Sequence, residues 1–299
     1  MRTHFVILLF IVAIQCNAQT PDRNVLRQKE DTLQNLCHQM YGLDTQDERF
    51  TADSLFTRVL VRALLTPFSF SYPFDSLMPI SRLYAPDSSF RIFTWQVPLG
   101  DETSMHKGAI QMNMKDGSLV LFPLIDKTDS IPNPEECITG PEKWIGATYY
   151  RILLRNHRNK KIYTLFGISQ PNSQTSRKTM DILQFNNQRP VFGDALFQFP
   201  ANDTTVKYNP KMTRFMMTYK KHAAARFNFD ESLDMVIKEH LISETNEPDK
   251  SWTLVGDGDY EGFEWKSGQW KYIKKVFDQT SEQAPTPKPI KKTGQLPGN

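Results

Sequence analysis

Short strand-like runs follow one another through most of this chain, and they constrain its fold more than any other feature. From Phe90 onward, runs rich in β-branched and aromatic residues alternate with turn-rich breaks, and no helical stretch lies between them. Parallel strands need a long crossover connection, which is usually a helix. We therefore expect largely antiparallel pairing, with the order of the strands in space following their order in sequence.

The central part of this pattern is the stretch 144–199, which contains four strand-like runs separated by polar turns. Upstream, Asp116-Gly117 marks a hairpin, since Asp-Gly is among the strongest short hairpin signals. The predicted strands are 90–97, 108–114, 119–124, 147–155, 160–169, 179–185, 191–199, 214–219, 224–229, 234–242, 252–255, 259–266 and 270–277.

An antiparallel meander of this length cannot stay flat, because a large open sheet would leave long edges exposed. The expected fold class is therefore mainly β, a long antiparallel β-meander of about twelve strands with a propeller-like, barrel or sandwich arrangement. Alternation within a run predicts which side chains share a face. In 90–97, Phe93, Trp95 and Val97 fall on one side and Ile92 on the other.

Two short amphipathic helices are predicted before the β region. Apolar residues within 33–40 recur at the spacing of one helical face, and Gly42 supplies a stop. A second apolar stripe covers 55–64, with Thr51 or Asp53 as its N-cap. Such stripes usually pack on a core, so we expect both helices to cover one side of the β-domain.

The remaining segments complete the expected domain organisation. Residues 19–30 are polar and predict a flexible lead-in. The prolines of 68–89 predict an extended segment, so that 19–89 forms a helical and extended unit before a β-meander domain at 90–278. The closing segment 279–299 contains four prolines and no apolar period, which predicts a disordered tail.

Residues 1–18 have the pattern of a secretory signal peptide. Arg2 precedes an apolar segment, and Cys16 and Ala18 place small residues before a cleavage site. The apolar segment is shorter than the roughly 20 residues that cross a bilayer, and no later segment is apolar enough to do so. A lipidated Cys16 fits less well, because the bulky Gln15 precedes it. We expect a secreted or periplasmic protein without a membrane span.

Charge and cysteine content narrow the functional classes further. Cleavage would remove Arg2, one of 36 basic residues, so that 35 face 33 acidic residues. A chain so close to neutral gives no basis for binding nucleic acid or an acidic membrane surface. Cys37 and Cys137 would remain, and a disulfide or two free thiols both stay open at this point.

No motif identifies a catalytic, cofactor-binding or metal-binding residue, and we expect no cofactor. The segment 257–261 resembles the front half of a calcium loop but lacks the remaining ligands, so an exposed turn explains it better. The sequence contains neither HExxH nor GxSxG. The histidines outside 1–18 have no ligand spacing and are predicted to be scattered on the surface: His38, His106, His157, His222 and His240.

By its length, the irregular segment 126–143 is the best candidate for a functional or disordered loop. Aromatic rings on or beside strands are a second candidate feature, because a secreted sugar-binding module uses such rings as stacking platforms. Core packing uses them more often. These rings belong to Trp95, Trp144, Tyr149, Tyr150, Trp252, Trp265 and Trp270.

Several stretches together resemble a group of secreted proteins of Bacteroidetes-type bacteria that has no known activity. They are YPFDSL followed by APDSSFRIFTW, the pair YYRILL and KIYTLFGI, the pair DILQF and PVFGDALF, and the close DGDYEGFEWKSGQWKYI. The resemblance covers most of the chain after 1–18, up to about Phe277, and consists of turns and strands. It implies an exported location in such a bacterium and brings no site residue.

These features predict an exported envelope protein that acts as a binding or interaction module, with an envelope protein or a glycan as its partner. The alternative is a secreted hydrolase, acting on glycans, with carboxylates assembled at one end of the β-domain. Two carboxyl groups facing each other across a deep pocket would favour the hydrolase. A core without any pocket would count against an enzyme.

Overall fold

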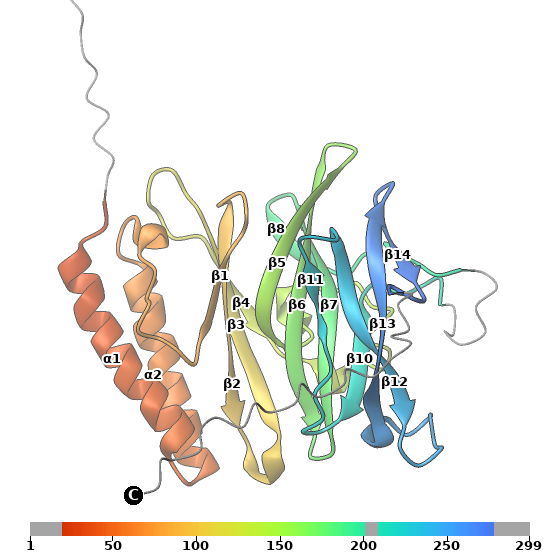
Figure 1. Ribbon diagram of the computed structural model, residues 1–299. Coiled ribbons are helices and arrows are strands. Elements are labelled where there is room, and N and C mark those ends of the chain that lie inside the picture. Colours follow the sequence, from red (N-terminus) through yellow and green to blue (C-terminus); the bar gives the residue numbers. More distant parts are fainter. Residues whose placement is uncertain (1–19, 201–208, 278–299) are drawn as a thin grey trace, which may run out of the picture.

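The computed structural model describes residues 20–200 and 209–277. Two helices, α1 (Arg23–Gly42) and α2 (Gln46–Leu64), lie side by side against the first of three β-sheets (Figure 1). The three sheets follow one another as stacked layers. The protein is thus a four-layer stack in which the second sheet lies between the other two.

The three sheets take their strands from successive parts of the chain. The first sheet contains β1 (Ser81–Tyr84), β2 (Phe90–Pro98), β3 (Ser104–Met112) and β4 (Leu121–Ile125) in that order. The second contains β5 (Thr148–His157), β6 (Lys160–Asn172), β7 (Thr175–Asn186), β8 (Arg189–Phe192) and β10 (Phe215–Lys220). The third contains β9 (Phe197–Gln198), β11 (Phe227–Asp230), β12 (Met235–Ser243), β13 (Leu254–Lys266) and β14 (Gln269–Ile273).

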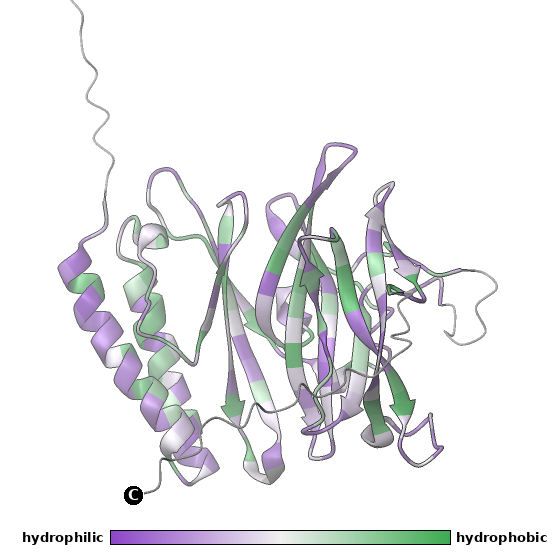
Figure 2. Ribbon diagram, in the orientation of Figure 1, coloured by the Kyte–Doolittle hydropathy of each residue, from purple (hydrophilic) through white to green (hydrophobic). Residues whose placement is uncertain are grey.

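Each boundary between layers is filled by its own hydrophobic core. Phe56 and Phe93 belong to the core between the helices and the first sheet. Leu165 belongs to the core between the first and second sheets, and Phe166 and Trp270 to the core between the second and third. Hydrophobic residues accordingly concentrate on the strands, and the turns that connect them are hydrophilic (Figure 2). Burial of each such side chain contributes roughly 1.5–3 kcal/mol.

The alternation predicted for 90–97 is confirmed in β2. Phe93, Trp95 and Val97 face the helices, whereas Ile92 faces the second sheet. The Trp95 indole also donates a hydrogen bond of 2.8 Å to the Asp53 carboxylate. This bond satisfies two buried polar groups at once and fixes α2 on the first sheet.

The expected fold class is confirmed: the chain is mainly β, with two helices before an antiparallel series of strands. The described residues form fourteen strands where about twelve were expected. None of the three sheets, as far as they are described, closes on itself, so the barrel alternative is not adopted. Packing of sheet on sheet is the arrangement that a sandwich has, extended here to three layers.

The expected order of strands is wrong at two places. β10 pairs with β7, although β8 and β9 lie between them in sequence. β9 pairs with β14 in parallel, with Trp270 opposite Phe197. The second sheet is thereby completed by a strand from further along the chain, and the third sheet receives an edge strand from the segment that joins β8 to β10.

The predicted strand 191–199 is in fact two strands in different sheets. Gly193 separates them with a φ of +92°, in the left-handed region that glycine adopts without a steric penalty. A Cβ atom at this position would lie 2.7 Å from the Cys137 carbonyl oxygen. The chain can therefore leave the second sheet after β8 and enter the third at β9.

Both helices begin earlier than the sequence predicts. Residues 19–30 were expected to be a flexible lead-in, but α1 begins at Arg23, and the Asp22 carboxylate caps it by accepting hydrogen bonds from two backbone amides. α2 is capped by a reciprocal Thr45–Glu48 capping box, not by Thr51 or Asp53. The first turn of α2 is polar, and in α1 six polar residues (27–32) separate the buried Leu26 from Leu33, so the apolar period does not reveal either start.

Several expectations concern residues outside the described ranges. The signal peptide at 1–18 and the disordered tail at 279–299 both lie there. Among the described residues, neither helix combines the length and the apolar content that a membrane-spanning helix needs.

The two cysteines are both free thiols in the structure. Cys37 lies on α1 within the core between the helices and the first sheet, with 1% of its surface exposed. Burial raises the pKa of its thiol to about 12. Cys137 lies in the connection between β4 and β5 and is partly exposed. The structure therefore corresponds to the alternative with two unpaired thiols.

Titration with Ellman's reagent tests this arrangement on protein lacking residues 1–18. At pH 8 we expect one thiol, Cys137, to react in the folded protein, because the buried Cys37 stays protonated and inaccessible. Two thiols should react in denaturant without reductant. A count of zero in denaturant, rising to two after reduction, would show a disulfide instead.

Candidate functional site

The connection between β4 and β5 (126–147) crosses from the first sheet to the second, and its irregular part 126–143 carries the polar contacts of the candidate site. It contains two 3-10 turns, η3 (Thr128–Ser130) and η4 (Pro141–Lys143). Isolated β-bridges tie both of its ends to neighbouring segments. The sequence predicts a functional or disordered loop here, and the structure shows an ordered one, referred to below as the crossing loop.

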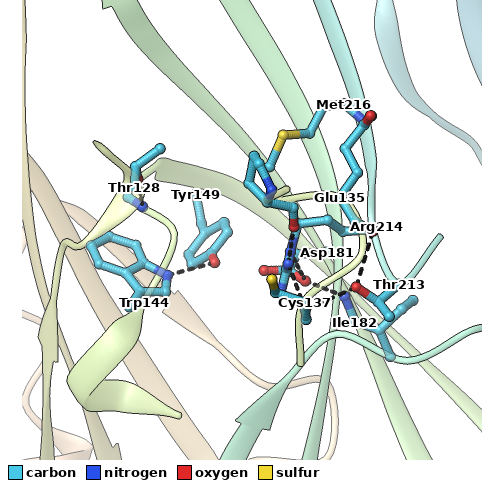
Figure 3. A network of polar contacts seen from close by, with 12 residues as sticks. Thr128, Glu135, Cys137, Trp144, Tyr149, Asp181, Ile182, Thr213, Arg214 and Met216 are labelled. Atoms are coloured by element: carbon cyan, nitrogen blue, oxygen red, sulfur yellow. Dashed lines mark hydrogen bonds and ion pairs between the residues drawn. The ribbon is translucent and has the colours of Figure 1, made fainter. Parts of the chain in front are cut away.

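A fully buried ion pair fixes the middle of the crossing loop (Figure 3). Arg214 Nε lies 3.0 Å from Asp181 Oδ1, and neither side chain exposes more than 1% of its surface. The same guanidinium donates hydrogen bonds to the carbonyls of Pro134 and Cys137. Burial raises the pKa of Asp181, although Arg214 opposes that shift. Charges at this depth are tolerated because they are paired and hydrogen-bonded.

Thr213 and Glu135 add a second set of bonds at the same place. The Thr213 backbone amide and hydroxyl both donate to the Glu135 carbonyl, and the hydroxyl also donates to the Cys137 carbonyl. The Glu135 carboxylate accepts from the Met216 amide at 3.2 Å. Burial raises the pKa of Glu135. The middle of the crossing loop is thus held against β7 and the start of β10.

Asp126 fixes the beginning of the crossing loop. Its carboxylate accepts hydrogen bonds from the amides of His106, Thr128 and Gly146 and from the Thr128 hydroxyl. Burial alone would raise the pKa of Asp126, but the hydrogen bonds from His106 and Thr128 outweigh burial and lower it to about 2. Asp126 is therefore ionised at every pH at which the protein is expected to work.

Gly146 is the residue that lets β5 approach this carboxylate. A Cβ atom at Gly146 would overlap the Asp126 side chain. Glycine is needed here for close approach, not for an unusual backbone angle.

His106 is the least expected member of the site. It lies on β3, and its side chain is only 4% exposed. Its Nδ1 atom lies 3.5 Å from the Asp126 carboxylate, and its Nε2 atom finds no hydrogen-bond partner among the described residues. A buried polar atom normally has a partner, so this orphaned nitrogen leaves a hydrogen bond open to a water or a ligand atom.

His106 and Asp126 line a cavity of about 650 Å³ between the crossing loop and the ends of the first two sheets, called the loop cavity below. Thr128 and Asp129 line it from the loop. Arg177, on β7, lines it from the second sheet and donates to the Thr218 hydroxyl at 3.1 Å. The cavity therefore offers hydrogen-bond donors and acceptors, with charges of both signs.

The acidic segment 257–261 does not form a metal site. It lies within β13, so it is part of a strand and not the exposed turn that the sequence suggests. Asp257 Oδ2 lies 2.8 Å from His240 Nδ1, and Glu261 pairs with Lys238. His240 Nε2 also lies 3.8 Å from Glu261 Oε1, so both carboxylates already have partners. Among the described residues, no group of three or more His, Cys, Asp or Glu could hold a metal ion.

Four of the five histidines lie at least partly on the surface, as the sequence predicts, and His106 is the exception. Strand alternation is the sequence signal that predicts the burial of His106. The predicted strand began at Gly108, but β3 begins at Ser104, which places His106 on the same buried face as Ile110. Most of the seven aromatic residues lie in cores, and Trp252 is the most exposed, at 45%.

Urea unfolding at different pH values tests the state of Asp126. The folded pKa of about 2 lies below the unfolded value of 3.8, so the ionised carboxylate stabilises the fold above pH 4, and this contribution is lost as the pH falls towards 2. The shift corresponds to about 2 kcal/mol. We expect the stability difference between the wild type and Asp126→Asn to shrink by that amount between pH 5 and pH 2, while other carboxylates cancel in the comparison. A difference that does not change with pH would contradict the assignment.

Comparisons of this chain with protein-family models, with curated proteins and with solved structures found no match, so the functional conclusion depends on the geometry of the site.

Proposed function

We propose that the protein is an exported binding module that holds a hydroxyl-bearing ligand, such as a sugar unit of a glycan, in the loop cavity. The observation that carries this proposal is His106, a residue of the cavity lining whose buried Nε2 atom has no hydrogen-bond partner among the described residues. Export is supported by the signal-peptide pattern of residues 1–18.

The chemistry of the lining supports a neutral polar ligand. Arg177 supplies a donor and positive charge, Asp129 supplies an acceptor, and Asp126 and Asp129 both supply negative charge. A strongly anionic ligand would be repelled by Asp126 and Asp129, and a strongly cationic ligand would be repelled by Arg177. A hydroxyl group both donates and accepts, so several hydroxyls on one ligand can use both kinds of partner.

The rigidity of the crossing loop also supports binding. Asp126 anchors its start, and Arg214 anchors its middle. A cavity that is formed before the ligand arrives costs little conformational entropy on binding. Its volume of about 650 Å³ is within the range of small-molecule sites.

Hydrolysis in the same cavity is the second candidate function, and the contact between His106 and Asp126 is the observation that favours it. An imidazole oriented through Nδ1 by a carboxylate can take a proton at Nε2. The two opposing carboxylates of a glycoside hydrolase are less well supported. Asp126 is ionised and already accepts four hydrogen bonds, so it has neither the proton of a general acid nor a free oxygen for nucleophilic attack.

A glycan array followed by calorimetry tests the proposal. We expect the purified protein to retain at least one glycan and Asp129→Asn to weaken that binding about tenfold, because a charge-assisted hydrogen bond is lost. Asp129 is exposed and makes no side-chain hydrogen bond among the described residues, so the variant should keep its fold. Asp249→Asn, an exposed position that does not line the loop cavity, is the matched control and should bind like the wild type.

Two results would count against the binding module. One is a failure to retain any glycan, or equal affinity in the wild type and Asp129→Asn. The other is the release of cleaved products during incubation with the retained glycan, which would establish the hydrolase instead.

A further inference from the structure

A second cavity, of about 510 Å³, lies at the opposite end of the same two sheets. On β3, His106 lines the loop cavity, whereas Met112 lines this second one. On β7, Arg177 lines the first and Phe185 the second. Six residues of extended strand, about 20 Å, separate His106 from Met112. The second cavity, called the end cleft below, shares no lining residue with the loop cavity.

The floor of the end cleft is apolar. Met112, Phe122 and Phe185 are partly buried side chains that pack on the core between the first and second sheets. Val120 and Met114 continue this surface towards solvent and are partly exposed. Methionine side chains are flexible and polarizable, so they adapt to ligands of irregular shape. An apolar floor of this kind favours a hydrocarbon group.

The rim of the end cleft is polar and carries positive charge. Asn113, Asn159 and Gln188 present amide groups there. Lys160 also lies at the rim and has no ion-pair partner among the described residues, whereas Lys161 pairs with Asp87 at 2.7 Å. None of the described residues that line the end cleft is acidic. This charge distribution complements a single negative charge at the entrance.

We propose that the end cleft binds a fatty acid, with the hydrocarbon chain on the apolar floor and the carboxylate at the rim near Lys160. Ser89, Tyr163 and Gln184 also line the cleft, but Ser89 and Tyr163 hydrogen-bond to Asp87, and Gln184 donates to Asp194. The N–H and C=O groups of a peptide backbone would therefore lack free partners on the apolar floor, whereas an unbranched hydrocarbon chain needs none. The positive rim distinguishes a carboxylate from a neutral head group. The proposal goes beyond the loop cavity and does not depend on the ligand held there.

Calorimetric titration of the full chain with decanoate tests the proposal. We expect saturable binding, and at least ~10-fold weaker binding to Val120→Glu, because this change places a carboxylate on the apolar surface. Lys160→Glu should weaken binding about threefold or more, as expected for an exposed charge. Lys211→Glu, which changes an exposed lysine that does not line the end cleft, should bind decanoate like the wild type.

Met114→Glu provides a second test if Val120→Glu does not fold. Both residues lie in the connection between β3 and β4, but Val120 directly precedes β4 and its carbonyl accepts a hydrogen bond from the Met112 amide. Decanol supplies the head-group control and should bind about threefold more weakly than decanoate. Absence of saturable decanoate binding would overturn the proposal. Equal affinity for decanoate in the wild type, Val120→Glu and Met114→Glu would also overturn it. Sedimentation of the protein with phosphatidylcholine vesicles, abolished by Met114→Glu, would identify a membrane contact instead and would also overturn it.

Discussion

The second sheet has to bury both of its faces, and the rest of the structure depends on this requirement. Successive residues of β6 face opposite cores, with Leu165 towards the first sheet and Phe166 towards the third. One partner layer cannot cover both faces, so a sheet lies on each side, and the helices then cover the outer face of the first sheet. Between stacked sheets, solvent reaches the layers at their ends, and both candidate cavities lie there.

The same stacking explains why the polar groups of the loop cavity are held so firmly. The crossing loop passes from one layer to the next, so its backbone carbonyls are taken out of water and need new partners. Arg214 and Thr213 supply these partners, and the Asp181 carboxylate balances the buried charge. Hydrogen bonds that satisfy the loop backbone thus also set the shape of the cavity.

Local patterns predict the elements of this fold but not the contacts that make the site. Alternation identifies both faces of β2, and Asp116-Gly117 identifies the β3–β4 hairpin. Each of these signals is contained in a stretch of a few consecutive residues. The start of α1 is missed because the polar residues 27–32 interrupt the apolar period between Leu26 and Leu33. The Arg214–Asp181 pair joins residues 33 positions apart, and the His106–Asp126 contact joins residues 20 apart. Strand alternation predicts the burial of His106, but nothing in the local sequence identifies the partner of His106 or of Arg214, since only the tertiary fold brings the partners together.

The central claim is that a ligand in the loop cavity supplies the hydrogen-bond partner that His106 Nε2 lacks among the described residues. The most direct measurement is the ¹⁵N chemical shift of the histidine side chains during titration with the retained glycan. The account predicts a saturable shift of His106 Nε2 while His38, exposed on α1, stays unchanged. Saturation of binding without any change at His106 would contradict it.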